Sequence, residues 1–211
     1  MEMYFNGRSA LLYYGLLLEQ CFLTSAKKKQ QLIDIPGADG EHDLLENWGE
    51  PTYEGRTLTA YFSICDAVVW NRQRLVNDLE GRTVPIILPG HPDRYMTGTV
   101  HVAAAGAHPG EKICITAQCD PWLYSRRESR YIVPASGTAV PLTLRNNGRK
   151  LVVPELEVAD SAATITVAGE AITFAPGTHQ DGRLAISGGG ALSIAVQGGA
   201  VTVRYREAVL L

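Results

Sequence analysis

The 211-residue sequence has no long hydrophobic run, no surplus of basic residues and no recognisable targeting segment. No apolar stretch approaches the ~20 residues that a membrane-spanning helix needs, so we expect no membrane association. The N-terminus lacks a basic region followed by an apolar one, which predicts no secretory signal and a protein made and kept in a cytoplasm, or released by lysis. The net charge of −3 does not favour nucleic acid as the main partner.

Paired cysteines are also missing, because none of Cys21, Cys65, Cys114 and Cys119 belongs to a C-x-x-C motif. Cys114 and Cys119 lie in the strand-like stretch KICITAQC, where an odd separation puts their side chains on opposite faces. We therefore expect reduced, half-buried thiols rather than a shared metal ion.

Catalytic signatures are absent as well. The sequence has no G-x-S-x-G and no H-E-x-x-H motif, and glycine-rich residues 187–192 lack the lysine and the following helix of a phosphate-binding loop. The remaining candidates, His91, Asp93, His101 and His108, are scattered over loops and one strand. We predict no enzyme activity, no cofactor, and no catalytic, cofactor-binding or metal-binding residue.

One acidic stretch, DIPGADGEHD at residues 34–43, could be read as a metal or acid–base site. An EF-hand loop would need three spaced acidic residues before its glycine, whereas only Asp39 closely precedes Gly40. A zinc site would need more than the single His42. Pro36-Gly37 begins a turn, so the stretch is predicted to be the tip of a hairpin.

Strand patterns dominate residues 1–125. Two alternating apolar sets predict buried strand faces: Leu58, Ala60, Phe62 and Ile64, and Ile113, Ile115, Ala117 and Cys119. A shorter helical turn is expected from Ser9 to Gly15, followed by the apolar strand LLLEQCFL at 16–23.

One longer helix is predicted over residues 66–81, with Asp66 as its N-cap and Gly81 in the left-handed position at its end. Its apolar stripe consists of Val68, Val69, Leu75, Val76 and Leu79, and Trp70 at the edge of the stripe is expected to be a core residue.

Beyond about residue 130 the sequence predicts a succession of hairpins, with turns at Asn147-Gly148, near Gly169 and at Gly198-Gly199. In the last of these, Leu192, Ile194 and Val196 are expected to oppose Val201, Val203 and Tyr205.

Charge also divides the chain. Residues 1–125 carry 10 Lys and Arg against 15 Asp and Glu, whereas residues 126–211 carry 9 against 7. We expect two domains, 1–127 and 128–211. The fold class is mainly β, with a barrel-like or sandwich-like N-terminal domain that contains one helix and a small C-terminal antiparallel β-sandwich.

Several motifs occur in the order found in a known family. They are YFNGRSALLYYGLLLE near the N-terminus, KKKQQLIDIPGADGEHDL, YEGRTLTAYFSI, the helix at 66–81, PDRYMTGTV and CDPWLY. In this order and spacing the chain resembles the distal tail proteins, often called Dit, of long-tailed phages with non-contractile tails. The resemblance covers nearly the whole chain and is best in residues 1–125.

The resemblance implies a structural hub at the virion tail tip, assembled in the host cytoplasm of a phage or prophage. The N-terminal domain would form a hexameric ring, and the C-terminal domain, galectin-like or carbohydrate-module-like, would project outward. The implied partners are the tail tube protein on one face, and on the other a tail-associated protein that carries fibres or lytic enzyme, with receptor-binding proteins as further candidates. The Pro-Gly-x-Asp-Gly element would be a structural turn.

Ring closure requires two different, complementary surfaces on each subunit, and exposed strand edges can supply them. Residues 59–65 and 16–23 are long enough to serve. If the acidic surface of residues 1–125 lines the lumen, DNA would pass through without adhering.

Two other functions stay open. The C-terminal sandwich could recognise host cell-wall glycan, which an exposed tyrosine or tryptophan in a polar groove would favour. Its aromatic residues are only Tyr131, Phe174 and Tyr205, so a spacer or docking surface is the preferred interpretation. A hydrolase would require at least three polar side chains converging in one cleft. Hub proteins of contractile tails have a similar shape and are poorly separated by sequence.

Overall fold

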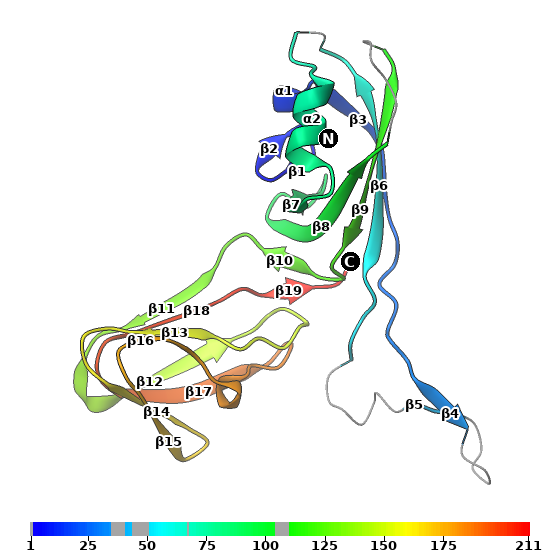
Figure 1. Cartoon of the computed structure of the whole chain (residues 1–211). Helices are drawn as coiled ribbons and strands as arrows, with labels where there is room; N and C mark the ends of the chain where they lie inside the picture. Colours follow the sequence, from blue (N-terminus) through cyan, green and yellow to red (C-terminus); the bar gives the residue numbers. More distant parts are fainter. Residues whose placement is uncertain (1, 35–40, 44–50, 67, 104–109) are drawn as a thin grey trace. The chain divides into compact units, whose positions relative to one another are not determined.

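The computed structural model describes residues 2–34, 41–43, 51–66, 68–103 and 110–211. The mainly β fold is confirmed. Contacts divide the chain into two compact units, Met1–Leu123 with Leu210–Leu211, and Tyr124–Val209 (Figure 1). The chain therefore passes from one unit to the other twice. None of the helices in the described ranges is long and apolar enough to cross a membrane.

The first unit is built on one large antiparallel sheet with the strand order β2-β1-β7-β8-β9-β6-β3. The bounds of these strands, in that order, are Arg8–Ser9, Tyr4–Phe5, Thr83–Ile87, Arg94–Val102, Lys112–Cys119, Arg56–Ile64 and Leu16–Leu23. The sheet is open, with β2 and β3 at its ends, so the described strands are not closed into a barrel.

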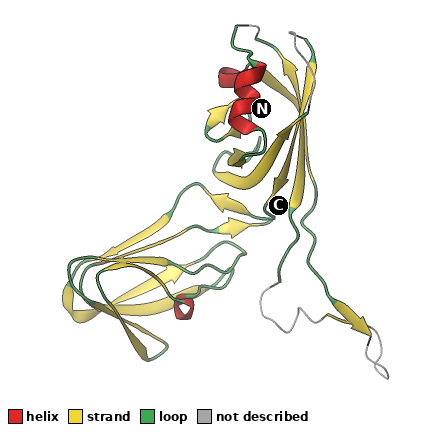
Figure 2. Cartoon of the chain, viewed as in Figure 1, coloured by secondary structure: helices red, strands yellow, loops and turns green. Residues whose placement is uncertain are grey.

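One face of this sheet carries the core. The two apolar sets predicted for β6 and β9 are buried, as alternation along a strand requires. Two helices pack near the sheet, α1 (Ala10–Tyr14) and α2 (Arg72–Leu79) (Figure 2). Tyr14, Leu75 and Leu79 contribute their buried side chains to the core.

Helix α1 begins and ends where the sequence predicts, and a tight hairpin precedes it. Asn6 and Gly7 both adopt positive φ between β1 and β2, as a tight hairpin turn requires. The Ser9 hydroxyl accepts a hydrogen bond from the Leu12 amide at 2.9 Å and caps α1. Gly15 ends α1 in the left-handed conformation, with φ 69°.

Helix α2 is shorter than predicted. It starts at Arg72, and its N-cap is Asn71, whose side chain accepts a hydrogen bond from the Arg74 amide. Asp66 instead caps a separate turn by accepting from the amides of Val68 and Val69. The extended backbone of Asn71 interrupts the helical path, so the predicted apolar stripe breaks and Val68 is 95% exposed. Gly81 has the predicted left-handed conformation, with φ 67°.

A two-stranded ribbon leads from the large sheet to the acidic stretch. After β3 and before β6, Thr24 donates to the Thr57 carbonyl, and Lys28 and Tyr53 form an isolated bridge. Further along, β4 (Leu32–Asp34) pairs with β5 (Glu41–Asp43) in antiparallel register. The flanks of the predicted hairpin thus pair, whereas its turn, residues 35–40, lies outside the described residues.

The second unit contains the predicted antiparallel sandwich. One sheet has the order β11-β18-β13-β16 and the other β12-β17-β14-β15. The bounds in these orders are Ser129–Val133, Val201–Tyr205, Glu155–Val158 and Gly177–Gln180, then Ser136–Arg145, Ala191–Gly198, Ala163–Val167 and Glu170–Phe174. Short strands β10 (Leu123–Ser125) and β19 (Ala208–Val209) pair with one another, and a 3-10 turn spans Gly182–Leu184.

Of the three predicted hairpins in this unit, one is confirmed. Strands β14 and β15 pair across Ala168 and Gly169, which both have positive φ. The hairpin at Gly198-Gly199 is wrong, because β17 and β18 belong to different sheets. Their inward residues do form the core, but neither strand pairs with the other.

The hairpin at Asn147-Gly148 is also wrong. The Asn146 side chain is buried and donates to the carbonyls of Lys150, Ile186 and Ser187. These bonds hold the chain after β12 as a loop, and β12 pairs with β17 instead. Hydrogen bonds from the Asn146 side chain to backbone carbonyls thus take the place of the backbone hydrogen bonds of a hairpin.

Candidate functional site

The most conspicuous feature of the first unit is the open edge of β3. One side of β3 pairs with β6, with a register shift between Leu18 and Gln20, and no described strand pairs with its other side. An eight-residue edge leaves backbone donors and acceptors that a further strand can satisfy. The prediction that residues 16–23 form an available edge is therefore confirmed.

The other predicted edge, residues 59–65, is not available. These residues belong mostly to β6, which pairs with β3 on one side and with β9 on the other. The apolar alternation of β6 resembles that of an edge strand, because alternation reports the buried face and not the number of neighbours.

Apolar side chains gather on the outer face of the sheet beside the β3 edge. Leu17 is 46% exposed, Phe22 57% and Tyr61 38%. Their cross-strand partners, Ser63, Thr59 and Gln20, show that all three point away from the core. The rings of Phe22 and Tyr61 meet edge to face, with centroids 6.4 Å apart. Exposed aromatic and aliphatic groups beside an open edge are typical of an interaction surface.

The rest of this outer face is polar and contains many hydroxyl groups. Thr83 and Thr99 share a hydrogen bond of 2.8 Å, and Thr57 donates to Gln118 at 3.3 Å. Lys112 lies 2.8 Å from Glu19 and, together with the Ser63 hydroxyl, lowers the pKa of that carboxyl. The charges of this pair offset one another.

A buried arginine lies at the start of β6. Arg56 is only 3% exposed, and its Nε donates to the Thr24 carbonyl at 2.6 Å. Directly opposite on β9 lies Cys119, which is also buried. Burial lowers the pKa of Arg56 and raises that of Cys119 to about 12. Its place in the alternation with Leu58 puts Arg56 on the core face, although a charged side chain is usually exposed.

The residues weighed as metal or catalytic groups do not converge. No group of three His, Cys, Asp or Glu side chains in the described ranges could hold a metal ion. Asp43 accepts from the Gln31 amide and pairs with Lys28 at 3.2 Å, so it stabilises the ribbon. His101, on β8, lies 3.3 Å from Glu80, and His91 lies in the turn before β8. Asp39 and His108 lie outside the described residues.

The cysteines are free thiols in separate places. Cys119 is buried and Cys114 is half-buried, which confirms that these two side chains point to opposite faces of β9. Cys21 is half-buried, and burial raises its pKa. Cys65, expected to be half-buried, is exposed, and its Sγ lies 3.3 Å from the Gly15 carbonyl.

The three aromatic residues of the sandwich, Tyr131, Phe174 and Tyr205, pack in its core. Tyr131 and Tyr205 stack with ring centroids 6.1 Å apart, and the Tyr205 hydroxyl donates to the Arg145 carbonyl at 2.6 Å. Phe174 is buried against the side chain of His179. These three residues therefore do not form the exposed aromatic platform on which sugar-binding proteins usually stack a ring.

No protein-family model matches the chain, and no curated protein matches it in sequence. In fold, the chain is similar to the crystal structure of the SPP1 Dit protein (gp 19.1), described as a paradigm of the hub adsorption apparatus in phages that infect Gram-positive bacteria. The similarity covers 99% of each chain, with a TM-score of 0.67 and 14% identical residues. The resemblance indicated by the ordered sequence motifs is thus confirmed at the level of the fold, over the whole length of both chains.

Proposed function

We propose that this protein is a structural component of a phage tail, the hub that joins the tail tube to the adsorption apparatus at the tail tip. The observation that carries this proposal is the full-length likeness to a Dit protein, which includes both units. The ordered sequence motifs support it independently of the fold. The protein would act without catalysing a reaction.

Six copies would close into a ring through residues 1–127, and the open edge of β3 is the surface that we assign to one side of each contact. A closed ring uses heterologous contacts, in which one surface of a subunit meets a different surface of the next. The β3 edge supplies backbone groups that pair with no further described strand, and Leu17 and Phe22 supply apolar area that a neighbour would remove from water.

The two faces of such a ring would have different partners. The tail tube protein would dock on one face, and the tail-tip protein that carries fibres or lytic enzyme on the other. Residues 128–211 would project as a spacer or docking surface. DNA would cross only the lumen, where the acidic balance of residues 1–125 disfavours adhesion.

The test is the solution mass of the full chain by light scattering after size exclusion, with negative-stain images of the same peak. The expected mass is six times the 22.9 kDa of one chain, and the images should show a central opening. Leu17→Lys and Phe22→Lys should lower the fraction of rings, because each places a charge at the contact. Ile132→Lys is the matched control, since Ile132 is 65% exposed on the second unit.

Rings that form equally well in all three variants would contradict the β3 edge as the contact, while leaving the hub proposal intact. A protein that stays monomeric at every concentration, and also after addition of the tail tube protein, would contradict the hub itself.

A further inference from the structure

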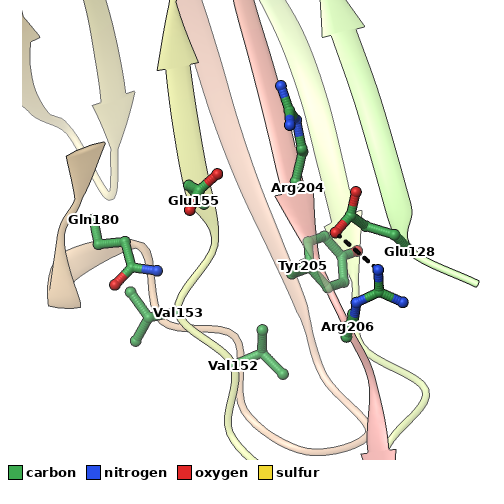
Figure 3. A pocket seen from close by; sticks show the side chains of 8 residues that line it. All are labelled: Glu128, Val152, Val153, Glu155, Gln180, Arg204, Tyr205 and Arg206. Carbon is green, nitrogen blue, oxygen red and sulfur yellow. Dashed lines mark ion pairs between the residues drawn. The ribbon is translucent and has the colours of Figure 1, made fainter. Parts of the chain in front are cut away.

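The second unit contains a pocket of about 230 Å³ at one end of the sheet β11-β18-β13-β16 (Figure 3). Its polar lining comes from Glu128, Glu155, Gln180, Arg204 and Arg206, and Val152 and Val153 form an apolar wall. The pocket lies wholly within the sandwich, so what it binds does not depend on ring formation.

Three of the polar residues form a row across adjacent strands. Glu155 on β13 lies directly opposite Gln180 on β16 and directly opposite Arg204 on β18. Directly opposite residues of antiparallel strands point to the same face of a sheet. The row therefore presents a carboxylate between an amide and a guanidinium.

Some of these groups are already occupied and others are not. Arg204 pairs with Glu157, and Arg206 lies 3.4 Å from Glu128 and donates to the Arg126 carbonyl. In contrast, Glu155 and Gln180 make no side-chain hydrogen bond or ion pair within the described ranges. The Nε of Arg204 is buried and has no hydrogen-bond partner among the described residues. The Glu155 carboxylate and the Gln180 amide thus remain for a ligand, whereas the buried Nε does not reach one.

The mixture of groups indicates the class of ligand. A site for an anion would offer mainly donors, and a site for a cation would offer mainly acceptors. Here the lining holds two arginines and two glutamates, so its charges balance, and Gln180 adds both a donor and an acceptor. A hydroxyl group both donates and accepts, so a hydroxyl-rich ligand can form hydrogen bonds with every polar group of this lining.

We infer that this pocket binds one neutral sugar unit, with its hydroxyl groups on Glu155, Gln180 and Arg204 and its C–H face on Val152 and Val153. The volume lies below the ~300 Å³ at which pockets for drug-sized ligands begin, which fits a single ring rather than a long chain. Tyr205 also lines the pocket, but it is buried and its hydroxyl is bound to Arg145. Without a stacking platform, the affinity should be in the millimolar range.

The lining does not favour catalysis, although several polar side chains converge. It includes no serine, threonine, cysteine, histidine, lysine or aspartate, and each arginine pairs with a glutamate. No nucleophile with an adjacent base is therefore present in the pocket.

Ligand-observed saturation-transfer NMR on the full chain tests the inference. Glucose, galactose and N-acetylglucosamine are the neutral probes, and glucuronate and inorganic phosphate are the charged ones. At least one neutral sugar should receive saturation. Glu155→Gln and Gln180→Ala should each weaken the binding of that sugar about tenfold, because each removes a group that would bond to its hydroxyls.

Asp160→Asn is the matched control for charge, since Asp160 is exposed on the same unit and does not line the pocket. Unchanged thermal unfolding of both pocket variants is expected, because neither side chain has a partner to lose. The inference is overturned if no neutral sugar receives saturation, if only the charged probes do, or if the pocket variants bind as well as Asp160→Asn. None of these outcomes bears on the hub proposal, which rests on the first unit and the fold.

Discussion

The ring of Tyr53 meets the ring of Trp122 edge to face, with centroids 5.4 Å apart and an interplanar angle of 84°. Three residues after Tyr53, Arg56 lies opposite Cys119, three residues before Trp122. The motifs YEGR and CDPW, distant in sequence, are thus neighbours at one end of β6 and β9. Each motif therefore supplies half of one packed cluster.

The aromatic pair should contribute measurably to the stability of the first unit. Tyr53→Ala is expected to lower the free energy of unfolding by about 1 kcal/mol beyond the loss of buried area, since an edge-to-face pair contributes roughly that much. Tyr53→Phe keeps the ring and should retain this part. All three tryptophans, Trp48, Trp70 and Trp122, belong to the first unit, so urea unfolding followed by tryptophan fluorescence reports on that unit alone. Equal losses in the two variants would assign the effect to the hydroxyl.

Gly15 should be intolerant of any side chain for two separate reasons. Its φ is 69°, and an added Cβ would lie 2.9 Å from the Asp66 carbonyl oxygen and 3.2 Å from the Trp70 amide nitrogen. Gly15→Ala is therefore expected to destabilise the first unit by more than about 1 kcal/mol. Fluorescence-monitored urea unfolding is again the measurement.

Gly7→Ala is the matched control for that variant. Gly7 has a similar φ of 74°, but nothing lies within 4 Å of its added Cβ. Gly7→Ala should lose only the free energy that a positive φ costs an alanine. The additional loss in Gly15→Ala then measures the steric clash with the chain around Asp66. If Gly7→Ala is as damaging as Gly15→Ala, the backbone conformation alone explains the requirement for glycine.

Local signals in the sequence predicted the parts of the fold that local contacts determine. The Ser9 cap, the Gly15 terminus and the Ala168-Gly169 hairpin follow from side chains and φ angles within a few residues. The buried faces of β6 and β9 follow from alternation, because burial on one side of a sheet has a period of two.

The features that the sequence did not predict depend mainly on contacts between residues that are far apart in the chain. Gly198-Gly199 looks like a hairpin turn, yet the strands on its two sides pair with different sheets. The N-cap of α2 is Asn71 and not the predicted Asp66. Both residue types are good caps, so the local sequence does not show which of the two begins the helix. The row of Gln180, Glu155 and Arg204 is assembled from three strands, so its residues show no common motif in the sequence.

The loop after β12 provides a test of side-chain control over the fold. Asn146 is 1% exposed, and its amide makes three donor bonds to backbone carbonyls, while its oxygen accepts from the Gly148 amide. Asn146→Ala leaves these groups without partners and is expected to destabilise the second unit by about 2–3 kcal/mol.

Amide hydrogen exchange of peptides from residues 136–205 is the suitable measurement for Asn146→Ala, because the second unit contains no tryptophan. Asn147→Ala serves as the control, since Asn147 is exposed and the hydrogen bond of its side chain goes to Glu207. Faster exchange across both sheets in Asn146→Ala alone is expected. Faster exchange confined to the loop would instead show that the network orders the loop without stabilising the sandwich.

The first unit should lose stability in alkali, and Cys119 should account for the first part of the loss. Burial raises the pKa of its thiol from 9.0 to about 12, whereas in the unfolded chain the thiol ionises near its ordinary value. Above pH 9 the unfolded state therefore binds fewer protons than the folded state. The contribution of this thiol to stability is complete below pH 9 and falls by about 1.4 kcal/mol per pH unit as the pH rises towards 12.

Cys119→Ala should make that decline shallower, which the urea midpoint measured against pH by tryptophan fluorescence can show. Part of the decline will remain, because burial also raises the pKa of Cys21 and raises that of Tyr14 from 10.0 to about 12. Below pH 9 the curves of the variant and the wild type should run parallel, separated only by the loss of packing around the thiol. Curves that stay parallel above pH 9 would mean that water reaches Cys119 in the folded protein, and would contradict a tightly closed contact between β6, β9 and Arg56.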